Sequence, residues 1–143
     1  MDAPDVNVLV HAFRPDSSDH ALCRAWLDRR LQETEPLAII PMVLAGFVRV
    51  AAHPRVFRNP SRLAEALEFC DYLRATPHCR QLEAGSRHWK IFSDLCRETQ
   101  SGGNDIPDAW LAAIAIEHRC RWITLDRGFA RFPGLRIDIP SAG

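Results

Sequence analysis

Apolar and polar positions form short blocks along the 143 residues, and the spacing within each block predicts a strand or a helix. Compact apolar runs rich in β-branched residues predict buried strands at residues 5–13, 36–40, 120–126 and 135–140, with a weaker candidate at 79–83. Runs with an apolar residue every three or four positions predict helices at residues 22–31, 42–53, 61–73, 86–95 and 105–118, and a short helical turn at 127–132. This alternation favours an α/β fold with a mainly parallel sheet, built as one domain over residues 1–143.

Residues that begin or interrupt helices define these boundaries further. Ser61 and Ser86 stand where each could cap the helix that follows it. Two glycines in the segment 99–104 predict a break before the next helix. Gly46 lies inside another predicted helix, where a glycine costs about 1 kcal/mol relative to alanine. Gly46 therefore weakens the prediction of a helix at 42–53.

The composition is that of an ordinary globular domain, with 47% hydrophobic and 25% charged residues. Eighteen basic and 18 acidic residues cancel, so the net charge does not indicate a nucleic-acid partner. No apolar run approaches the roughly 18 residues of a membrane span. The acidic start, residues 1–5, is not followed by the apolar core of a signal peptide. We therefore expect a cytoplasmic protein with no membrane contact.

The sequence disfavours several cofactor chemistries. The five cysteines are odd in number and include no CxxC pair, which argues against a disulfide framework or a zinc site. Cys23, Cys70 and Cys96 fall inside helical patterns, so we predict that they are buried thiols. The six histidines include no H-x-x-x-H pair, and no glycine-rich loop resembles a phosphate-binding or dinucleotide-binding motif.

Three aspartates flank the apolar segments in a way that suggests chemistry. Asp108 lies in the first turn of a predicted helix, Asp126 ends the strand after it, and Asp5 begins the strand at 5–13. Ligands of open α/β sheets bind beyond the carboxyl ends of strands and near helix N-termini, so these acids could converge. Converging carboxylates raise one another's pKa, and a divalent cation removes that repulsion. Oxygen ligands suit Mg²⁺ or Mn²⁺, which commonly activates water against a phosphodiester.

Local structure offers competing interpretations of the same acids. Asp105 stands three residues before Asp108, as in a capping box, and we favour an N-cap role for it. For Asp108, capping and metal binding are equally well supported by spacing. Asp126, taken alone, is better explained as a cap of the turn at 127–132. Asp5 is the hardest to dismiss, because an aspartate is disfavoured in a strand and costly when buried without a partner.

Arginines gather in one segment, where Arg49, Arg55 and Arg58 accompany the sequence RVAAHPRVFRNP. The planar guanidinium group matches phosphate oxygens, so these side chains are candidate phosphate contacts. A solvated surface explains them more simply, and from the sequence that interpretation is modestly favoured.

Three segments, taken in order, resemble one family. They are DVNVLVHAF from Asp5, GFVRVAAHPRVF from Gly46 and NDIPDAWLAAIAIEHRCRWITLDRGFARFPGLR from Asn104. Together they resemble the PIN-domain ribonucleases, and more closely the VapC-type toxins of bacterial toxin–antitoxin pairs. The resemblance covers nearly the whole chain. Each motif alone is weak, and their order and spacing make the resemblance specific.

The resemblance implies an α/β/α sandwich and a metal-dependent endoribonuclease. In that family, acids at one edge of the sheet bind Mg²⁺ or Mn²⁺, and water on the metal attacks the RNA phosphorus, leaving a 3′-hydroxyl and a 5′-phosphate. The catalytic, metal-binding acids correspond by position to Asp5, Asp108 and Asp126, and their polar supports to Asn7 and Thr124. Arg49 and Arg55 then become candidate contacts for RNA phosphates.

Two positions depart from the family pattern. Gly46 stands where many members carry a glutamate, and Gly128 stands where a second acid often follows the aspartate at the strand end. Some branches of the toxin family with a similar sequence around Gly46 also lack the glutamate. The glycine is therefore explained equally well as a feature of such a branch and as a loss of activity. The loss of both acids leaves three carboxylates, which favours one cation over two.

The resemblance also implies a small cognate antitoxin and either a homodimer or a toxin–antitoxin heterotetramer. It does not identify the RNA. Two other classes of function stay open. One is a catalytically weakened PIN-like module that binds RNA or a protein, which growth arrest surviving Asp5→Ala would favour. The other is a metal-dependent phosphatase or DNA nuclease on a related fold, which cleavage of DNA would favour.

Overall fold

The central feature of the fold is a parallel sheet. The computed structural model describes residues 1–141, and in that part of the chain five strands lie in the order β3-β2-β1-β4-β5, with each neighbouring pair parallel. The strands are β1 (Asp2–Pro4), β2 (Leu37–Ile39), β3 (Cys79–Gln81), β4 (Arg121–Ile123) and β5 (Arg136–Asp138). The predicted mainly parallel sheet is confirmed.

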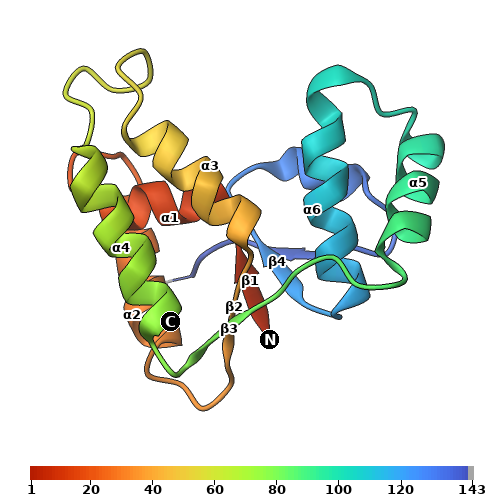
Figure 1. The fold of residues 1–143 in the computed structure, drawn as a ribbon, viewed down its shortest axis with the longest axis horizontal. Helices are drawn as coiled ribbons and strands as arrows, with labels where there is room; N and C mark the ends of the chain where they lie inside the picture. Colours follow the sequence, from red (N-terminus) through yellow and green to blue (C-terminus); the bar gives the residue numbers. More distant parts are fainter. Residues whose placement is uncertain (142–143) are drawn as a thin grey trace.

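Helices cover both faces of this sheet. In residues 1–141 the α-helices are α1 (Val6–Phe13), α2 (His20–Arg30), α3 (Pro41–Ala51), α4 (Leu63–Ala75), α5 (His88–Thr99) and α6 (Ile106–Glu117), and the 3₁₀ helices are η1 (Gly103–Asp105) and η2 (Arg127–Arg131). Helices α1 to α4 gather on one side of the sheet, and α5 and α6 lie together on the other (Figure 1). The predicted α/β/α sandwich is confirmed.

Packing, rather than length, stabilises these short strands. Every residue of β1 and β2 is buried. Trp122 of β4 is fully buried and lies 5.4 Å from the ring of Phe129. Phe47 of α3 is also fully buried and meets Phe13 of α1 edge-on at 5.2 Å. Burying side chains of this size contributes roughly 1.5–3 kcal/mol each, which offsets the few hydrogen bonds that strands of three residues can make.

The prediction of a strand at residues 5–13 is wrong. The strand is β1, which ends at Pro4, and the apolar residues after Asp5 form α1. Asp5 begins that helix, because its Oδ1 accepts a hydrogen bond from the backbone N–H of Val6 at 2.7 Å. A short apolar run fits a buried strand and a buried helix equally well. The aspartate before the run, a typical N-cap residue, is the signal that distinguishes them.

Both predicted serine caps are wrong as well. α4 begins at Leu63 without a side-chain cap, and the hydroxyl of Ser61 instead accepts a hydrogen bond from Arg14 Nη1 at 2.8 Å. α5 begins at His88 rather than at Ser86 and also lacks a capping side chain. Serine is common at N-caps and in loops, so its presence alone does not identify a helix start.

The two glycine-based predictions had different outcomes. The helix that contains Gly46 does form, as α3. α5 ends at Thr99, at the predicted break, but the left-handed residue that ends it is Gln100, with φ of 51°, rather than a glycine. Glycine is the usual residue for that conformation, and in this chain the two glycines lie two and three residues further on.

Two further expectations concern membrane-spanning helices and the state of the cysteines. No helix in residues 1–141 is both long enough and apolar enough to cross a bilayer.

The cysteines carry free thiols; Cys23 and Cys70 are buried as predicted, whereas Cys96 is only half-buried. Burial raises the pKa of the Cys23 and Cys70 thiols to about 11. Both therefore stay protonated and unreactive near neutral pH.

The carboxyl ends of the two central strands define the edge where chemistry is expected. Pro4 of β1 lies opposite Ile123 of β4, and the backbone N–H of Asp5 donates to the carbonyl of Ile123 at 2.8 Å. The next residue after each strand, Asp5 or Thr124, therefore leaves the sheet at the same edge. Ligands of open α/β sheets bind at this edge.

Candidate active site

Asp5 is the most buried of the predicted site acids, with 6% of its surface exposed. Its backbone follows β1 and begins α1, so the sheet holds it on one side and the helix on the other. Thr124, which follows β4, is 3% exposed, and its hydroxyl donates to Asp5 Oδ2 at 2.7 Å. This distance is that of a well-formed O–H···O hydrogen bond.

Asn7 and Thr124 extend this contact into a network. Asn7 Nδ2 donates to Asp5 Oδ2 and to Thr124 Oγ1, both at 3.2 Å. Asn7 Oδ1 accepts from the backbone N–H of Leu125 at 3.1 Å. The Thr124 hydroxyl also accepts from the backbone N–H of Asp126 at 3.0 Å, so its single donor and both of its acceptor positions are in use. The network joins the start of α1 to the segment after β4.

The electrostatics of Asp5 are those of a carboxylate short of positive charge. Burial raises the pKa of Asp5 to about 6, against the hydrogen bonds from Thr124 and the backbone of Val6, which lower it. The negative charges of Asp108 and Asp126 raise the pKa of Asp5 further. The protein thus holds this acid in place by donors and destabilises its charge by its surroundings.

Asp108 lies in the first turn of α6, as the sequence predicted, and its side chain is 33% exposed. Its Oδ2 accepts a hydrogen bond from Arg131 Nη2 at 3.2 Å, and the same nitrogen lies 3.2 Å from Asp105 Oδ1. Burial raises the pKa of Asp108, the Arg131 guanidinium lowers it, and the charges of Asp126 and Asp105 raise it. Arg131 therefore holds a pair of carboxylates at the start of α6.

The predicted N-cap role of Asp105 is wrong for its side chain. Asp105 is the residue before α6, but its carboxylate makes no capping hydrogen bond and pairs with Arg131 instead. Its backbone is helical, with φ of −82° and ψ of −16°, because η1 runs directly into α6. N-cap residues normally have extended backbones that turn the side chain onto the free N–H groups, and Asp105 does not.

Asp126 follows β4 and is exposed. Its Oδ1 accepts a hydrogen bond from the backbone N–H of Gly128 at 2.8 Å, so it caps η2, the role that the sequence favoured for this residue taken alone. Its charge also raises the pKa of Asp5 and of Asp108. A capping role and a place at the acidic edge are therefore compatible in Asp126.

Two hollows meet at Asp5. One of about 520 Å³ lies toward α6 and is lined by Asp5, Val6, Met42, Ala45, Gly46, Arg49, Pro107, Asp108 and Leu111. The other, of about 430 Å³, lies toward the loop after α3 and is lined by Asp5, Val6, Asn7, Val10, His11, Val50, Val56 and Phe57. Arg49 thus shares a hollow with two of the predicted acids. Arg55 is exposed on the loop, outside the residues that line either hollow.

Both departures from the family pattern lie at this edge. A Cβ atom at Gly46 would lie 2.9 Å from Val6 Cγ2, so the glycine lets α3 pack closely against the residue after Asp5. A Cβ atom at Gly128 would lie 2.9 Å from Asp126 Oδ1 and 3.1 Å from Arg131 Nη1. The space that a larger residue needs is therefore filled by Val6 in one case and by Asp126 and Arg131 in the other.

The residues fit a hard divalent cation in charge and donor type. Three carboxylates near one another supply only oxygen ligands, and the pKa of Asp5 is raised by burial and by the charges of Asp108 and Asp126. The side chains do not stand as a finished ligand set: within residues 1–141, no three His, Cys, Asp or Glu side chains converge on one point. Asp108 turns to Arg131, and Asp126 turns to Gly128. A three-ligand site therefore requires Asp108 and Asp126 to reorient toward Asp5.

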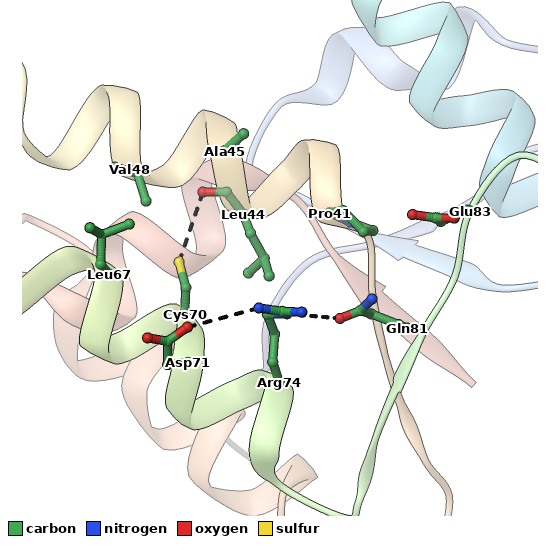
Figure 2. A pocket seen from close by; sticks show the side chains of 10 residues that line it. All are labelled: Pro41, Leu44, Ala45, Val48, Leu67, Cys70, Asp71, Arg74, Gln81 and Glu83. Atoms are coloured by element: carbon green, nitrogen blue, oxygen red, sulfur yellow. Dashed lines mark hydrogen bonds and ion pairs between the residues drawn. The ribbon is translucent and has the colours of Figure 1, made fainter.

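A further hollow, of about 390 Å³, lies between α3 and α4, away from the acidic edge. Figure 2 shows that Arg74 crosses it, within hydrogen-bond distance of Gln81 at 2.9 Å and near Asp71 at 3.9 Å. Cys70 Sγ donates to the carbonyl of Leu44 at 3.9 Å. Arg74 thus pairs with polar groups of the lining, and the charged side chains of this hollow, Asp71, Arg74 and Glu83, are exposed, unlike the buried Asp5.

Arg131 is the residue of the site that sequence reasoning missed. It lies in the segment RGFARF, five residues after Asp126. The only signal in the sequence is that a basic residue and two acids occur in adjacent predicted helical segments, which is common on any surface. The packing of η2 near the start of α6 is what turns this arginine into a partner of Asp105 and Asp108.

The comparison with protein families gives one match over most of the chain. The family model described as PIN domain matches residues 3–135. Ribonuclease VapC43 of Mycobacterium tuberculosis is 45% identical over 139 residues, which cover 97% of this chain and 95% of the relative. Ribonuclease VapC25 of the same organism is 42% identical over 132 residues, covering 92% of this chain and 93% of the relative.

A comparison of structures agrees at the level of fold. The structure of VapBC2 from Rickettsia felis, bound to a DNA fragment from the promoter, contains a chain that matches with a TM-score of 0.71. The match covers 96% of each chain at 16% sequence identity. At that identity the likeness concerns the backbone arrangement of sheet and helices alone.

Proposed function

The chain belongs to the PIN-domain family, in its VapC branch, and we propose that it is a divalent-metal-dependent endoribonuclease that serves as the toxin of a toxin–antitoxin pair. The relatives that are 42–45% identical over nearly the whole chain are ribonucleases by name. A DNA nuclease or a small-molecule phosphatase on a related fold has no comparable support.

One observation carries the proposal: a buried aspartate with a raised pKa stands at the carboxyl end of the central strand, held by Thr124 and Asn7. A buried carboxylate without a cationic partner is costly, and a neutral cap residue such as asparagine or serine would begin α1 without that cost. Such an acid at a ligand-binding edge is a candidate functional group. Asp5 therefore anchors the proposed metal site.

We assign Asp5, Asp108 and Asp126 as the ligands of one Mg²⁺ or Mn²⁺ ion. When bound, such an ion polarises the phosphodiester and lowers the pKa of water into the range where it is a nucleophile. The residues of this chain hold the reacting groups in place: Thr124 and Asn7 orient Asp5 through the distances given above. Polar groups behind metal ligands typically change metal affinity or activity by about 10- to 100-fold.

The RNA is proposed to cross the edge over the two hollows that meet at Asp5. Arg49 lines the larger hollow beside Asp5 and Asp108, where its guanidinium can contact a phosphate next to the scissile one. Arg55, exposed on the loop after α3, is at most a contact with a more distant phosphate. Both proposed contacts are with the RNA backbone, which every RNA sequence presents.

The partner we propose is a small cognate antitoxin. The structural neighbour from Rickettsia felis is a VapBC assembly, which supports a toxin that functions in a complex with its antitoxin. A homodimer or a toxin–antitoxin heterotetramer is the proposed state. Size-exclusion chromatography with light scattering, for the chain alone and co-expressed with its genomic neighbour, measures it directly.

The test of function is cleavage of RNA. Purified protein and its Asp5→Ala and Asp108→Asn variants are incubated with total RNA in Mn²⁺ or in EDTA, and new RNA 5′ ends are sequenced. We expect discrete cleavage sites that carry a 5′-phosphate, present only for the wild type with metal. A matched control is Asp28→Asn, which removes a half-exposed aspartate of α2 and should cleave like the wild type.

A second candidate function is a binding module without catalysis. It draws on the lack of a converged three-ligand set in residues 1–141 and on the glycines at positions 46 and 128. Under that alternative, the wild type and Asp5→Ala bind RNA equally and neither cuts it. Equal growth arrest by wild type and Asp5→Ala after induction would favour the binding module over the ribonuclease.

A further inference from the structure

Arg131 occupies the solvent-facing part of the acidic edge. Its Nη2 lies 3.2 Å from Asp105 Oδ1 and 3.2 Å from Asp108 Oδ2, so one nitrogen is shared by two carboxylates. Its Nη1 donates to the carbonyl of Gly128. The guanidinium carbon lies 4.3 Å from the ring centroid of Phe132, which is itself buried. Four groups thus fix this side chain in one position.

The absent side chain at position 128 provides the room for this arrangement. A Cβ atom at Gly128 would stand 3.1 Å from Arg131 Nη1 and 2.9 Å from Asp126 Oδ1, closer than almost all real contacts of that kind. A larger residue there would displace Arg131 or Asp126. In this chain, the guanidinium group of Arg131 therefore lies close to the space that a side chain at position 128 would enter.

Arg131 contacts Asp108, a carboxylate that the proposed metal ion also needs. Asp108 is one of the three proposed ligands, and the oxygen that faces Arg131 is Oδ2. A divalent cation on this carboxylate would repel the guanidinium group, and a turn of the Asp108 side chain toward Asp5 would break the hydrogen bond to Arg131. An arginine on a proposed metal ligand is a competitor for it.

We propose that Arg131 is a positioning residue, an internal counter-ion that binds Asp105 and Asp108 in the metal-free protein and must leave Asp108 before a divalent cation binds. Arg131 thereby keeps the metal affinity of the RNA-free protein low. The proposal rests on the proposed function for the identity of the metal ligands. It goes further in assigning a regulatory role to a residue of the chain itself.

The experiment measures Mn²⁺ binding to the full-length protein without RNA, by calorimetry and by the loss of the free Mn²⁺ electron-spin-resonance signal. Arg131→Met keeps an unbranched apolar stem that can pack against Phe132 but removes the guanidinium group and its charge. We expect it to bind Mn²⁺ about tenfold more tightly than the wild type. In EDTA its melting temperature should fall, because Asp105 and Asp108 lose their shared partner, and Mn²⁺ should raise that temperature more than in the wild type.

Arg127→Met is the matched control. Arg127 lies in the same η2 turn and is exposed, and within residues 1–141 no hydrogen bond or ion pair ties it to a carboxylate. Removing its charge should leave the Mn²⁺ dissociation constant within about twofold of the wild type. Any general electrostatic effect of losing one arginine is therefore measured separately.

Arg131→Lys tests the same point in case the methionine variant does not fold. A lysine carries the charge at one point and cannot contact Asp105, Asp108 and the Gly128 carbonyl together. We expect it to bind Mn²⁺ about threefold more tightly than the wild type, between the other two proteins. Equal affinity of the wild type and both Arg131 variants would overturn the proposal and leave the ribonuclease assignment intact. Absence of Mn²⁺ binding in every protein would overturn the proposed metal site and this inference together.

Discussion

The acidic edge of this protein has two halves that are built differently. The inner half consists of Asp5, Asn7 and Thr124; it is buried or half-buried and held by hydrogen bonds at 2.7–3.2 Å. The outer half consists of Asp105, Asp108, Asp126 and Arg131; it faces solvent and is held by shared ion pairs and a turn cap. Asp5 and Thr124 directly follow the central strands β1 and β4. In the outer half, Asp108 lies in the first turn of α6 and Asp126 caps η2.

This difference between buried hydrogen bonds and exposed ion pairs indicates which part of the site is fixed before a ligand binds. The inner half cannot rearrange without breaking hydrogen bonds that are buried, and each such loss costs about 1–3 kcal/mol. The outer half can rearrange cheaply, since exposed ion pairs contribute about 1 kcal/mol or less. We infer that Asp5 is preorganised and that Asp108 and Asp126 are recruited. Four experiments separate the halves on this basis.

The largest effect is expected from Asp5→Asn. The change keeps the size of the side chain and removes the negative charge from the only preorganised ligand, so RNA cleavage should fall by a factor on the order of 100 or more. Cleavage kinetics under single-turnover conditions in saturating Mn²⁺ measure it. Cleavage within threefold of the wild type would mean that the inner half is structural, and the site would then have to lie elsewhere.

The second effect is a pH dependence that belongs to the inner half. The pKa of Asp5 is raised to about 6 by burial, from an ordinary value of 3.8, so the folded protein favours the protonated form. The cost of the charge is absent below the unfolded-state pKa and fully present above pH 6. Stability therefore falls as the pH rises through this window, by roughly 3 kcal/mol for a shift of about two pKa units.

Urea unfolding in EDTA between about pH 4 and pH 7.5 measures this, as the difference between the wild type and Asp5→Asn at each pH. Taking the difference removes other groups that titrate, such as Asp16, whose pKa is lowered by its hydrogen bond with Arg14. A difference that stays constant with pH would show that Asp5 is not the strained acid the structure indicates.

The third effect comes from Thr124→Val, which keeps the shape of the side chain and deletes its hydroxyl. Asp5 then loses its shortest hydrogen bond, and Asn7 and the backbone N–H of Asp126 lose an acceptor. We expect a loss of about 2 kcal/mol in unfolding free energy and about tenfold in cleavage rate. Thr124→Ser, which retains the hydroxyl, should restore most of both, and a fully active valine variant would contradict the support role.

The smallest effect is expected from Asp105→Asn in the outer half. Asp105 makes no cap and shares Arg131 with Asp108, so the loss of its charge should change stability by about 0.5 kcal/mol or less. The cleavage rate should stay within about twofold of the wild type. A tenfold loss of cleavage with unchanged stability would identify Asp105 as a further metal ligand and would extend the outer half of the site.

The fold and the site differ in how far they followed from the sequence. The alternation of apolar blocks predicted the mainly parallel sheet, because burial of one face is a property of each segment. The three layers were implied by the resemblance to PIN-domain ribonucleases. The alternation failed at residues 5–13, where a helix replaced most of the predicted strand, since a mainly apolar run of eight residues fits either structure. The resemblance of ordered motifs pointed to Asp5, Asp108 and Asp126, and the structure brings them to one edge, where their charges act on one another.

Local sequence patterns sufficed for most of the elements after residue 13 and for the residue types at their ends, because hydrophobic spacing and turn residues act over a few neighbouring positions. Only the tertiary structure decided that Asp5 is a buried helix start with a raised pKa, and that Asp105 pairs with Arg131 instead of capping α6. These outcomes depend on contacts between segments more than 20 residues apart, such as Thr124 with Asp5 and Arg131 with Asp108. Burial and charge at a point in space are sums over such contacts, and the local pattern of a chain does not contain them.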